Sequence, residues 1–240
     1  MTYTKNSKLS GIIINNIKAA SVFEKHNINY CINGGRSLEE ACGYVKIKPD
    51  EVIKELKNIN GAYTGEIKVN EWSLDFLCDY IETNHHAFIR KTFPKMLKHS
   101  KKIFKDNNED ALKILEQLKR DFEIHMQKEE RLLFPYIKRL ADSEYMENDF
   151  EIAPFGLIKK PVLVMKKEHL SAHEKVSLLK KSFMDTKKIK GSIRIKNDLL
   201  KLFDEFEFDF HIHLHLENNI LFPKAILLEN KILKKITKNK

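Results

Sequence analysis

The sequence predicts an all-α protein made of a small amino-terminal helical domain followed by an antiparallel four-helix bundle. Glycine and proline are scarce, with eight and six in 240 residues. Apolar residues recur at spacings of three and four over long stretches, which is the pattern of one buried helix face. Four of these stretches are long and are paired by short polar segments, as in an antiparallel bundle.

The first 62 residues are expected to form a domain of short helices. The predicted helices cover residues 10–25, 37–43 and 50–57. Ser37 and Glu40 have the spacing of a capping box, and Pro49 suits the start of the third helix. Asn-Gly and Thr-Gly pairs near residue 62 predict a linker over residues 63–70.

The bundle is expected to occupy residues 71–240. Its four predicted helices cover residues 71–104, 109–141, 158–184 and 193–230. The polar residues 106–108 and 186–192 separate the helices within each pair. Residues 142–157, which include Pro154 and Gly156, connect the two pairs.

One motif occurs twice, on the second and fourth predicted helices. Residues 125–135 and 213–223 both read His-x-x-x-Glu-x-x-x-Leu-Phe-Pro. Residues four apart lie on the same face of a helix, so His125 with Glu129, and His213 with Glu217, each direct an imidazole and a carboxylate toward one point. The repeat therefore predicts two halves of a site that binds two metals.

A metal site in a bundle core draws its ligands from all the facing helices. The first helix offers His85 and His86, which differ by about 100° and are not separated by their neighbours. The third helix offers His169, with His173 one turn later as an optional fifth imidazole. One histidine per helix gives the predicted set of ligands: His86, His125, Glu129, His169, His213 and Glu217.

His211, His213 and His215 cannot all face the core, because residues two apart differ by about 200° around a helix. His213 stands one turn from Glu217, so we expect His211 and His215 to be flanking or exposed. Imidazole and carboxylate without thiolate favour iron or manganese over structural zinc. The nitrogen-rich set favours two iron ions, and two carboxylates leave charge for an oxo or hydroxo bridge between them.

With these residues, the chain resembles the hemerythrin-like di-iron bundle, and more closely the Repair of Iron Centres family of iron-sulfur cluster repair proteins. The resemblance is carried by His86 ahead of Arg90 and Pro94, by Glu168-His169, and by the two repeats. It implies that His86 is the ligand of the first helix and that the two repeated glutamates bridge the irons.

The amino-terminal part is similar to the cysteine-bearing domain of that family. Residues 30–42 read Tyr-Cys-Ile-Asn-Gly-Gly-Arg-Ser-Leu-Glu-Glu-Ala-Cys. The family has two adjacent cysteines here, whereas this chain has Cys31 followed by Ile32. A role for a vicinal dithiol is therefore not expected, although Cys31 could act alone or with Cys42. For Cys42 itself, packing within a helix is the favoured interpretation.

The resemblance implies a stress-response protein that repairs or protects iron-sulfur clusters damaged by nitric oxide or oxidation, through iron delivery or nitric oxide removal. Its partners would be the damaged iron-sulfur proteins, and it would form a homodimer. Two alternatives remain open: a reversible carrier or sensor of oxygen or nitric oxide, which His173 would favour, and a nitric oxide reductase. Whether the protein is an enzyme is not decided by the sequence.

Composition limits the other classes of function. Three widely spaced cysteines indicate a reduced cytoplasmic compartment. No apolar run approaches the roughly 20 residues that span a bilayer, so no membrane association is expected. The net charge of +9 is distributed over lysines that alternate with apolar residues at helical spacing. This pattern is typical of solvated helix faces, so we expect no nucleic-acid binding.

Overall fold

The computed structural model describes residues 3–59, 69–104, 109–145, 150–184 and 192–238. In these ranges the elements are helical, with one isolated β-bridge between Lys8 and Ser37. The all-α prediction is confirmed. The chain divides into two compact units, one of residues 1–73 with 211–223, and one of residues 74–210 with 224–240. Residues 211–223 are nevertheless covalently continuous with the long helical run on both sides of them.

The amino-terminal part contains four short helices, α1 (Leu9–Asn15), α2 (Ala19–Lys25), α3 (Leu38–Val45) and α4 (Pro49–Ile59). The prediction of one helix over residues 10–25 was wrong, because the chain breaks between α1 and α2. Asn16 is extended there (φ −153°), and its side-chain oxygen accepts a hydrogen bond from the Lys18 N–H at 3.1 Å. An asparagine side chain that bonds the backbone two residues ahead replaces a helical hydrogen bond and favours a turn.

The start of α3 is fixed by the predicted capping box. The Ser37 hydroxyl accepts a hydrogen bond from the Glu40 N–H at 3.2 Å, and the Glu40 carboxylate accepts one from the Ser37 N–H at 2.8 Å. Two backbone donors that the helix leaves unsatisfied are thereby bonded. The linker predicted over residues 63–70 falls mainly outside the described residues, which resume at the 3-10 turn Val69–Glu71.

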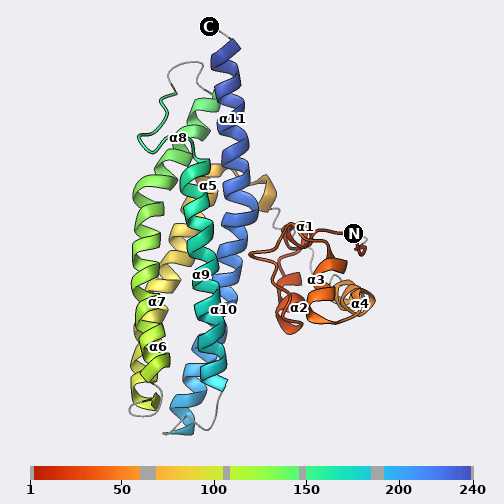
Figure 1. The fold of residues 1–240 in the computed structure, drawn as a ribbon, viewed down its shortest axis with the longest axis vertical. Helices are drawn as coiled ribbons and strands as arrows, with labels where there is room; N and C mark the ends of the chain where they lie inside the picture. The colour runs from red at the N-terminus through yellow and green to blue at the C-terminus, as the bar shows by residue number, and fades with distance from the viewer. Residues whose placement is uncertain (1–2, 60–68, 105–108, 146–149, 185–191, 239–240) are drawn as a thin grey trace. The chain divides into compact units, whose positions relative to one another are not determined.

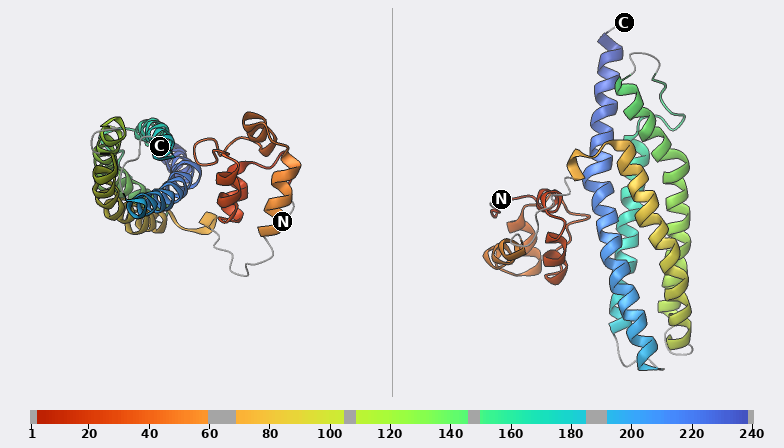
Figure 2. Two further views of the ribbon diagram at one scale, coloured as in Figure 1. Left: turned by 90° about the horizontal axis from the view of Figure 1, so that it is seen from below. Right: turned by 180° about the vertical axis from the view of Figure 1, so that it is seen from behind.

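The long helices follow the predicted order (Figures 1 and 2). The first run comprises α5 (Leu74–Tyr80), η3 (Ile81–His86) and α6 (Ala87–Phe104). The second comprises α7 (Glu109–Lys128), η4 (Glu129–Leu133) and α8 (Phe134–Tyr145). The third is α9 (Lys159–Met184), and the fourth comprises α10 (Ile193–Leu216), η6 (Glu217–Leu221) and α11 (Phe222–Lys238). Within the second unit, α7 packs against both α6 and α9.

Three of the four runs contain a π-helical turn, which the periodicity did not predict. Two of these turns, η4 and η6, begin at the glutamate of the repeated motif and end two residues before its proline. A proline has no N–H to donate, and its ring clashes with the carbonyl four residues earlier. A widened turn ahead of Pro135 and Pro223 relieves that clash. The Leu-Phe-Pro tail of the repeat thus explains why the helix changes its hydrogen-bond register at each glutamate.

An aromatic cluster fills the second unit next to the motif. Phe93 lies 5.0 Å from Phe206 and Phe122 lies 5.2 Å from Phe210, between ring centroids and in edge-to-face geometry. All four side chains are buried. Phe122 is three residues before His125, so the cluster borders the candidate ligands along the helix. Its packing excludes water from that end of the core.

A buried carboxylate ties the other end of the second unit together. Glu229 of α11 is 2% exposed and accepts hydrogen bonds from the Tyr136 hydroxyl at 2.6 Å and the Ile158 N–H at 2.9 Å. Burial, with the nearby Glu229 charge, raises the pKa of Tyr136. One side chain therefore joins α8, α11 and the segment that leads into α9.

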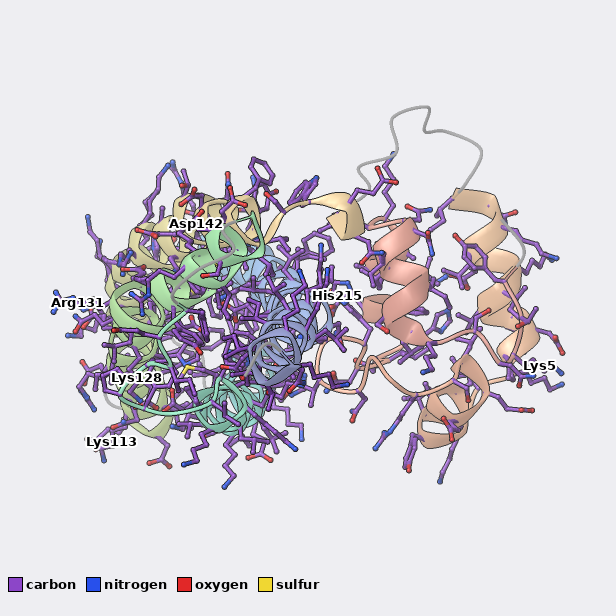
Figure 3. The ribbon with its side chains drawn as sticks, turned by 90° about the horizontal axis from the view of Figure 1, so that it is seen from above. Lys5, Lys113, Lys128, Arg131, Asp142 and His215 are labelled. Atoms are coloured by element: carbon purple, nitrogen blue, oxygen red, sulfur yellow. The ribbon has the colours of Figure 1, made fainter. Side chains whose placement is uncertain are left out.

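Lysine and arginine side chains lie on the outer faces of the helices, as Figure 3 shows for Lys113 and Arg131. This is the placement that the alternation of lysines with apolar residues predicted. In the described part of the chain, no helix combines the length and the apolar character needed to cross a membrane.

Candidate metal centre

Each repeat places its histidine and glutamate together in the core. His125 Nε2 lies 3.3 Å from Glu129 Oε1, and His213 Nε2 lies 2.9 Å from Glu217 Oε1. Both glutamates and His213 are fully buried, and His125 is 5% exposed. The four-residue spacing therefore brings an imidazole nitrogen and a carboxylate oxygen together twice, as the sequence predicted.

The first and third helical runs each add an imidazole to the repeats. His86 Nε2 lies 3.4 Å from Glu129 Oε2, so Glu129 has a histidine nitrogen near each of its two oxygens. His169 Nε2 lies 3.0 Å from His125 Nε2. Two nitrogens about 2 Å from one metal and at right angles would be about 3 Å apart. The His125–His169 separation is therefore suited to two ligands of a single ion.

Among the described residues, these six side chains form two groups that could each hold a metal ion. One group contains His86 and His213, the other contains His125 and His169, and both contain Glu129 and Glu217. In each group the ligand atoms lie within 4.8 Å of one another. Two imidazoles per group and two shared carboxylates are the arrangement expected of a pair of metals.

The donor set and its burial fit iron. An ionised carboxylate in a dry core costs several kcal/mol unless a cation or a metal compensates it, and here two of them lie side by side at 0% exposure. Imidazole and carboxylate ligands without thiolate match the preferences of Fe(II) and exclude the sulfur-rich sites of structural zinc.

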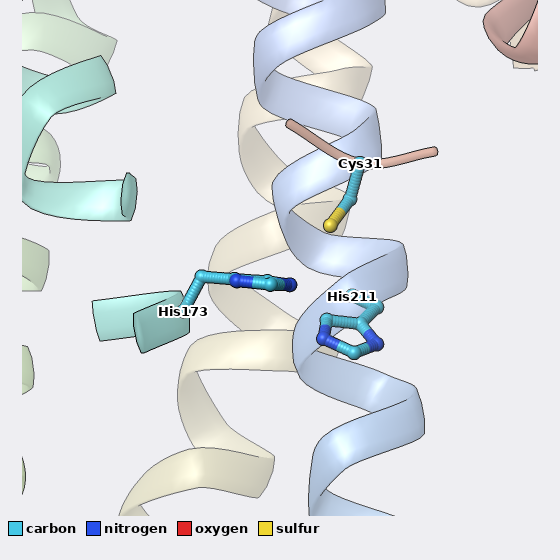
Figure 4. Close-up of side chains that lie close together, drawn as sticks. All are labelled: Cys31, His173 and His211. Carbon is cyan, nitrogen blue, oxygen red and sulfur yellow. The ribbon is translucent and has the colours of Figure 1, made fainter. Parts of the chain in front are cut away.

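The remaining histidines of the first and third runs lie outside both groups. His85 Nδ1 is 2.9 Å from Asp209 Oδ1, and its ring meets Tyr80 edge-to-face. The choice between His85 and His86 that the sequence left open thus falls on His86 for this cluster. His173, the optional fifth imidazole, belongs to neither His/Glu group; Figure 4 draws it with Cys31 and His211.

His211 and His215 flank the candidate site, since neither belongs to the two His/Glu groups, but the alternative that they would be exposed was wrong, because residues of the amino-terminal part cover them. His211 is 8% and His215 is 1% exposed. His211 Nδ1 lies 2.6 Å from Glu24 Oε1, and both rings contact the ring of Tyr30. Burial lowers the pKa of His215 to about 3, so this ring is neutral at physiological pH. Figure 3 marks its position on the helix.

Cys31 is held in the same unit by two asparagines of the repeat. Its carbonyl accepts hydrogen bonds from the Asn218 amide at 3.3 Å and from the Asn219 amide at 3.2 Å. Its side chain, drawn in Figure 4, is buried. Its Sγ lies 3.4 Å from Asn29 Oδ1. Burial and then the charge of Glu24 raise the pKa of the thiol, so Cys31 is a neutral thiol here. Only thiolates are strong nucleophiles.

Two carboxylates beside the candidate ligands were not among the predicted site residues, although Glu168 belongs to the Glu168-His169 pair noted in the sequence. Glu130 Oε1 lies 2.7 Å from His86 Nδ1, and Glu168 Oε2 lies 2.8 Å from His125 Nδ1. Burial alone would raise the pKa of Glu130, but the hydrogen bonds from His86 and Arg90 outweigh it and lower the pKa to about 2. The hydrogen bond from His125, aided by Lys128, lowers the pKa of Glu168 to about 2.

A cavity of about 290 Å³ adjoins the second group between α7 and α9. His125, His169, Glu168 and Lys128 are among the residues that line it. It is large enough for several waters or for a diatomic gas. A small molecule could therefore approach the His125–His169 side of the cluster through this space.

The comparisons with known proteins cover both parts of the chain. The family model described as the hemerythrin HHE cation binding domain matches residues 79–225, and ScdA_N, a domain of unknown function, matches residues 5–60. The iron-sulfur cluster repair protein YtfE of Enterobacter sp. (strain 638) is 25% identical over 92% of this chain and 97% of its own length. The protein of the same name from Yersinia pestis (strain Pestoides F) is 24% identical over the same shares.

Proposed function

The chain belongs to the hemerythrin HHE cation-binding family, and from this premise we propose that it is a di-iron protein that repairs or protects iron-sulfur clusters damaged by nitric oxide or oxidative stress. The observation that carries the proposal is the pair of four-residue groups that share Glu129 and Glu217. The relatives named for cluster repair align over nearly their whole length, including the amino-terminal domain, which supports the same activity.

In this proposal, His86 and His213 would hold one iron, His125 and His169 would hold the other, and Glu129 and Glu217 would be shared between them. When bound, a pair of irons would supply one-electron chemistry and a site of reaction for a diatomic gas. The protein contributes a dry core, because all six ligands are at most 5% exposed. It also contributes donors from four helical runs, as metal sites in helix bundles do.

Iron delivery and nitric oxide removal are two routes to the same outcome, and the cavity beside His125 and His169 suits the second. A nitric oxide reductase remains the enzymatic alternative for that reason. The reversible carrier was favoured by a fifth imidazole from His173, but His173 lies outside both groups among the described residues. Repair is therefore the better interpretation of this site.

The setting follows from the same proposal. The partners are damaged iron-sulfur proteins, and the compartment is the reducing cytoplasm, where Cys31, Cys42 and Cys78 would stay as thiols outside any disulfide. We propose a homodimer and a boundary between the two domains within residues 63–70. Because the Cys31 thiol is buried and neutral, we expect no nucleophilic role for it while it stays buried.

A repair assay tests the proposal. A purified [4Fe–4S] dehydratase, inactivated with nitric oxide, is incubated anaerobically with the iron-loaded chain, and recovery of dehydratase activity is measured. Recovery should exceed that given by the same amount of free Fe(II), and it should vanish with His125→Ala/His213→Ala. Equal recovery with free Fe(II) would refute repair. Release of nitrous oxide over many turnovers with an electron donor would assign the reductase instead.

A further inference from the structure

Each His/Glu group contains a histidine whose second ring nitrogen is bonded to an additional carboxylate. In the first group this is His86, whose Nδ1 is 2.7 Å from Glu130. In the second it is His125, whose Nδ1 is 2.8 Å from Glu168. Neither Glu130 nor Glu168 is part of the two groups themselves.

The two arrangements have the same layout. Each carboxylate also binds a cation that follows the histidine by about one helical turn, since Arg90 Nη2 lies 2.8 Å from Glu130 Oε1 and Lys128 Nζ contacts Glu168. The histidine and the cation come from one helical run, and the carboxylate comes from the next. Glu130 thereby links the second helical run to the first, and Glu168 links the third run to the second.

The consequence for the imidazole is a fixed tautomer. An ionised carboxylate can only accept, so Nδ1 of His86 and of His125 must carry the proton. Their Nε2 atoms then present lone pairs, and both face Glu129, at 3.4 and 3.3 Å. A metal requires this form of histidine, and the hydrogen bond also makes the ring a stronger ligand.

We propose that Glu130 and Glu168 are positioning residues, one for each metal, that fix the proton and the orientation of His86 and His125. The inference rests on the proposed function, in which the two groups hold the irons. Because each carboxylate supports a different group, each should control the affinity of a different metal. Glu130 is the more enclosed, at 17% side-chain exposure against 32% for Glu168, so its site should respond more strongly.

The test is a metal titration of the full chain with Glu130→Gln and Glu168→Gln. A glutamine keeps the shape of the side chain but lets an amide face the ring, so the tautomer is no longer fixed. Anaerobic titration of the metal-free protein with Co(II), in competition with a chelator and followed optically, resolves the two sites. Loss of such an outer partner typically weakens metal binding 10- to 100-fold.

The expected result is selective. In each variant one site should weaken about 10- to 100-fold, while the other keeps the affinity found in the wild type, and the weakened sites should differ between the variants. Glu123→Gln is the matched control, because Glu123 is an exposed carboxylate of α7 that pairs with Lys119 at the surface. It should leave both affinities unchanged.

Two other results separate the inference from the proposed function. If the wild type binds two Co(II) ions and the variants show either unchanged sites or equal weakening of both sites, the positioning role is refuted and the di-iron proposal stands. If the wild type itself takes up fewer than two ions, the proposed function fails. A purely structural role would lower the unfolding temperature of the metal-free variants without splitting the two affinities.

Discussion

Replacing the buried Glu229 with leucine should destabilise the metal-free protein strongly, although Glu229 belongs to no metal group. The carboxylate accepts from the Tyr136 hydroxyl at 2.6 Å and from the Ile158 N–H at 2.9 Å. Hydrogen bonds to a charged group contribute about 1.5–3 kcal/mol each, and leucine leaves both donors buried without an acceptor. Relief of the buried charge offsets part of the loss, so we expect a net cost of about 2–4 kcal/mol.

Thermal unfolding followed by circular dichroism provides the measurement. For a chain of this size, about 2–4 kcal/mol lowers the unfolding temperature by roughly 5–15 °C. Glu229→Gln keeps one acceptor oxygen and should lose less than half as much, and Tyr136→Phe removes one donor to the carboxylate and should cost about 1.5–3 kcal/mol. An unchanged or higher unfolding temperature for Glu229→Leu would refute the reasoning, since it would mean that the hydrogen bonds do not outweigh the burial of the charge.

Three further predictions concern the centre and the amino-terminal loop. Replacing His125 and His213 with alanine should abolish iron uptake in an anaerobic Fe(II) titration, and retained binding would contradict the assignment. The pKa values of Glu130 and Glu168 lie near 2 in the folded chain, below their value of 4.5 when unfolded, so their stabilisation should be complete above pH 4.5 and lost as the pH falls toward 2. Acid unfolding of the double glutamine variant should be less steep in that window, and an unaltered profile would exclude their contribution. Gly34→Ala should lower the free energy of unfolding, measured in urea, by about 1–3 kcal/mol. A Cβ at residue 34 would overlap the side chain of Asn219, which bonds the Cys31 carbonyl. An unchanged free energy of unfolding would show that the segment around Cys31 adjusts without cost.

The fold was predictable because its determinants are local. Apolar spacing indicated the long helices, and the capping box at Ser37 was predicted and is present. The helix break at Asn16 was missed, because an asparagine inside a periodic segment can either continue the helix or bond its own backbone. The π-helical turns at Glu129 and Glu217 were missed as well. Their signal was the proline six residues after each glutamate, which was treated only as part of the repeat.

The site was partly predictable for the same reason. The i, i+4 pairs and one histidine per helix are local patterns, and the structure brings these six residues together. The burial of His211 and His215 depends on Glu24 and Tyr30, about 185 residues earlier in the chain. The role of Glu130 likewise depends on a histidine 44 residues away. No spacing rule encodes contacts between residues so distant in sequence.

The central claim is a pair of irons bridged by Glu129 and Glu217, and its most direct test is iron content combined with Mössbauer spectroscopy. The chain is loaded anaerobically with ⁵⁷Fe(II), desalted and measured before and after oxidation. The account predicts about two irons per chain, magnetically coupled through the shared carboxylates, with coupling lost in Glu129→Ala/Glu217→Ala. One iron per chain, or two irons without coupling, would contradict it.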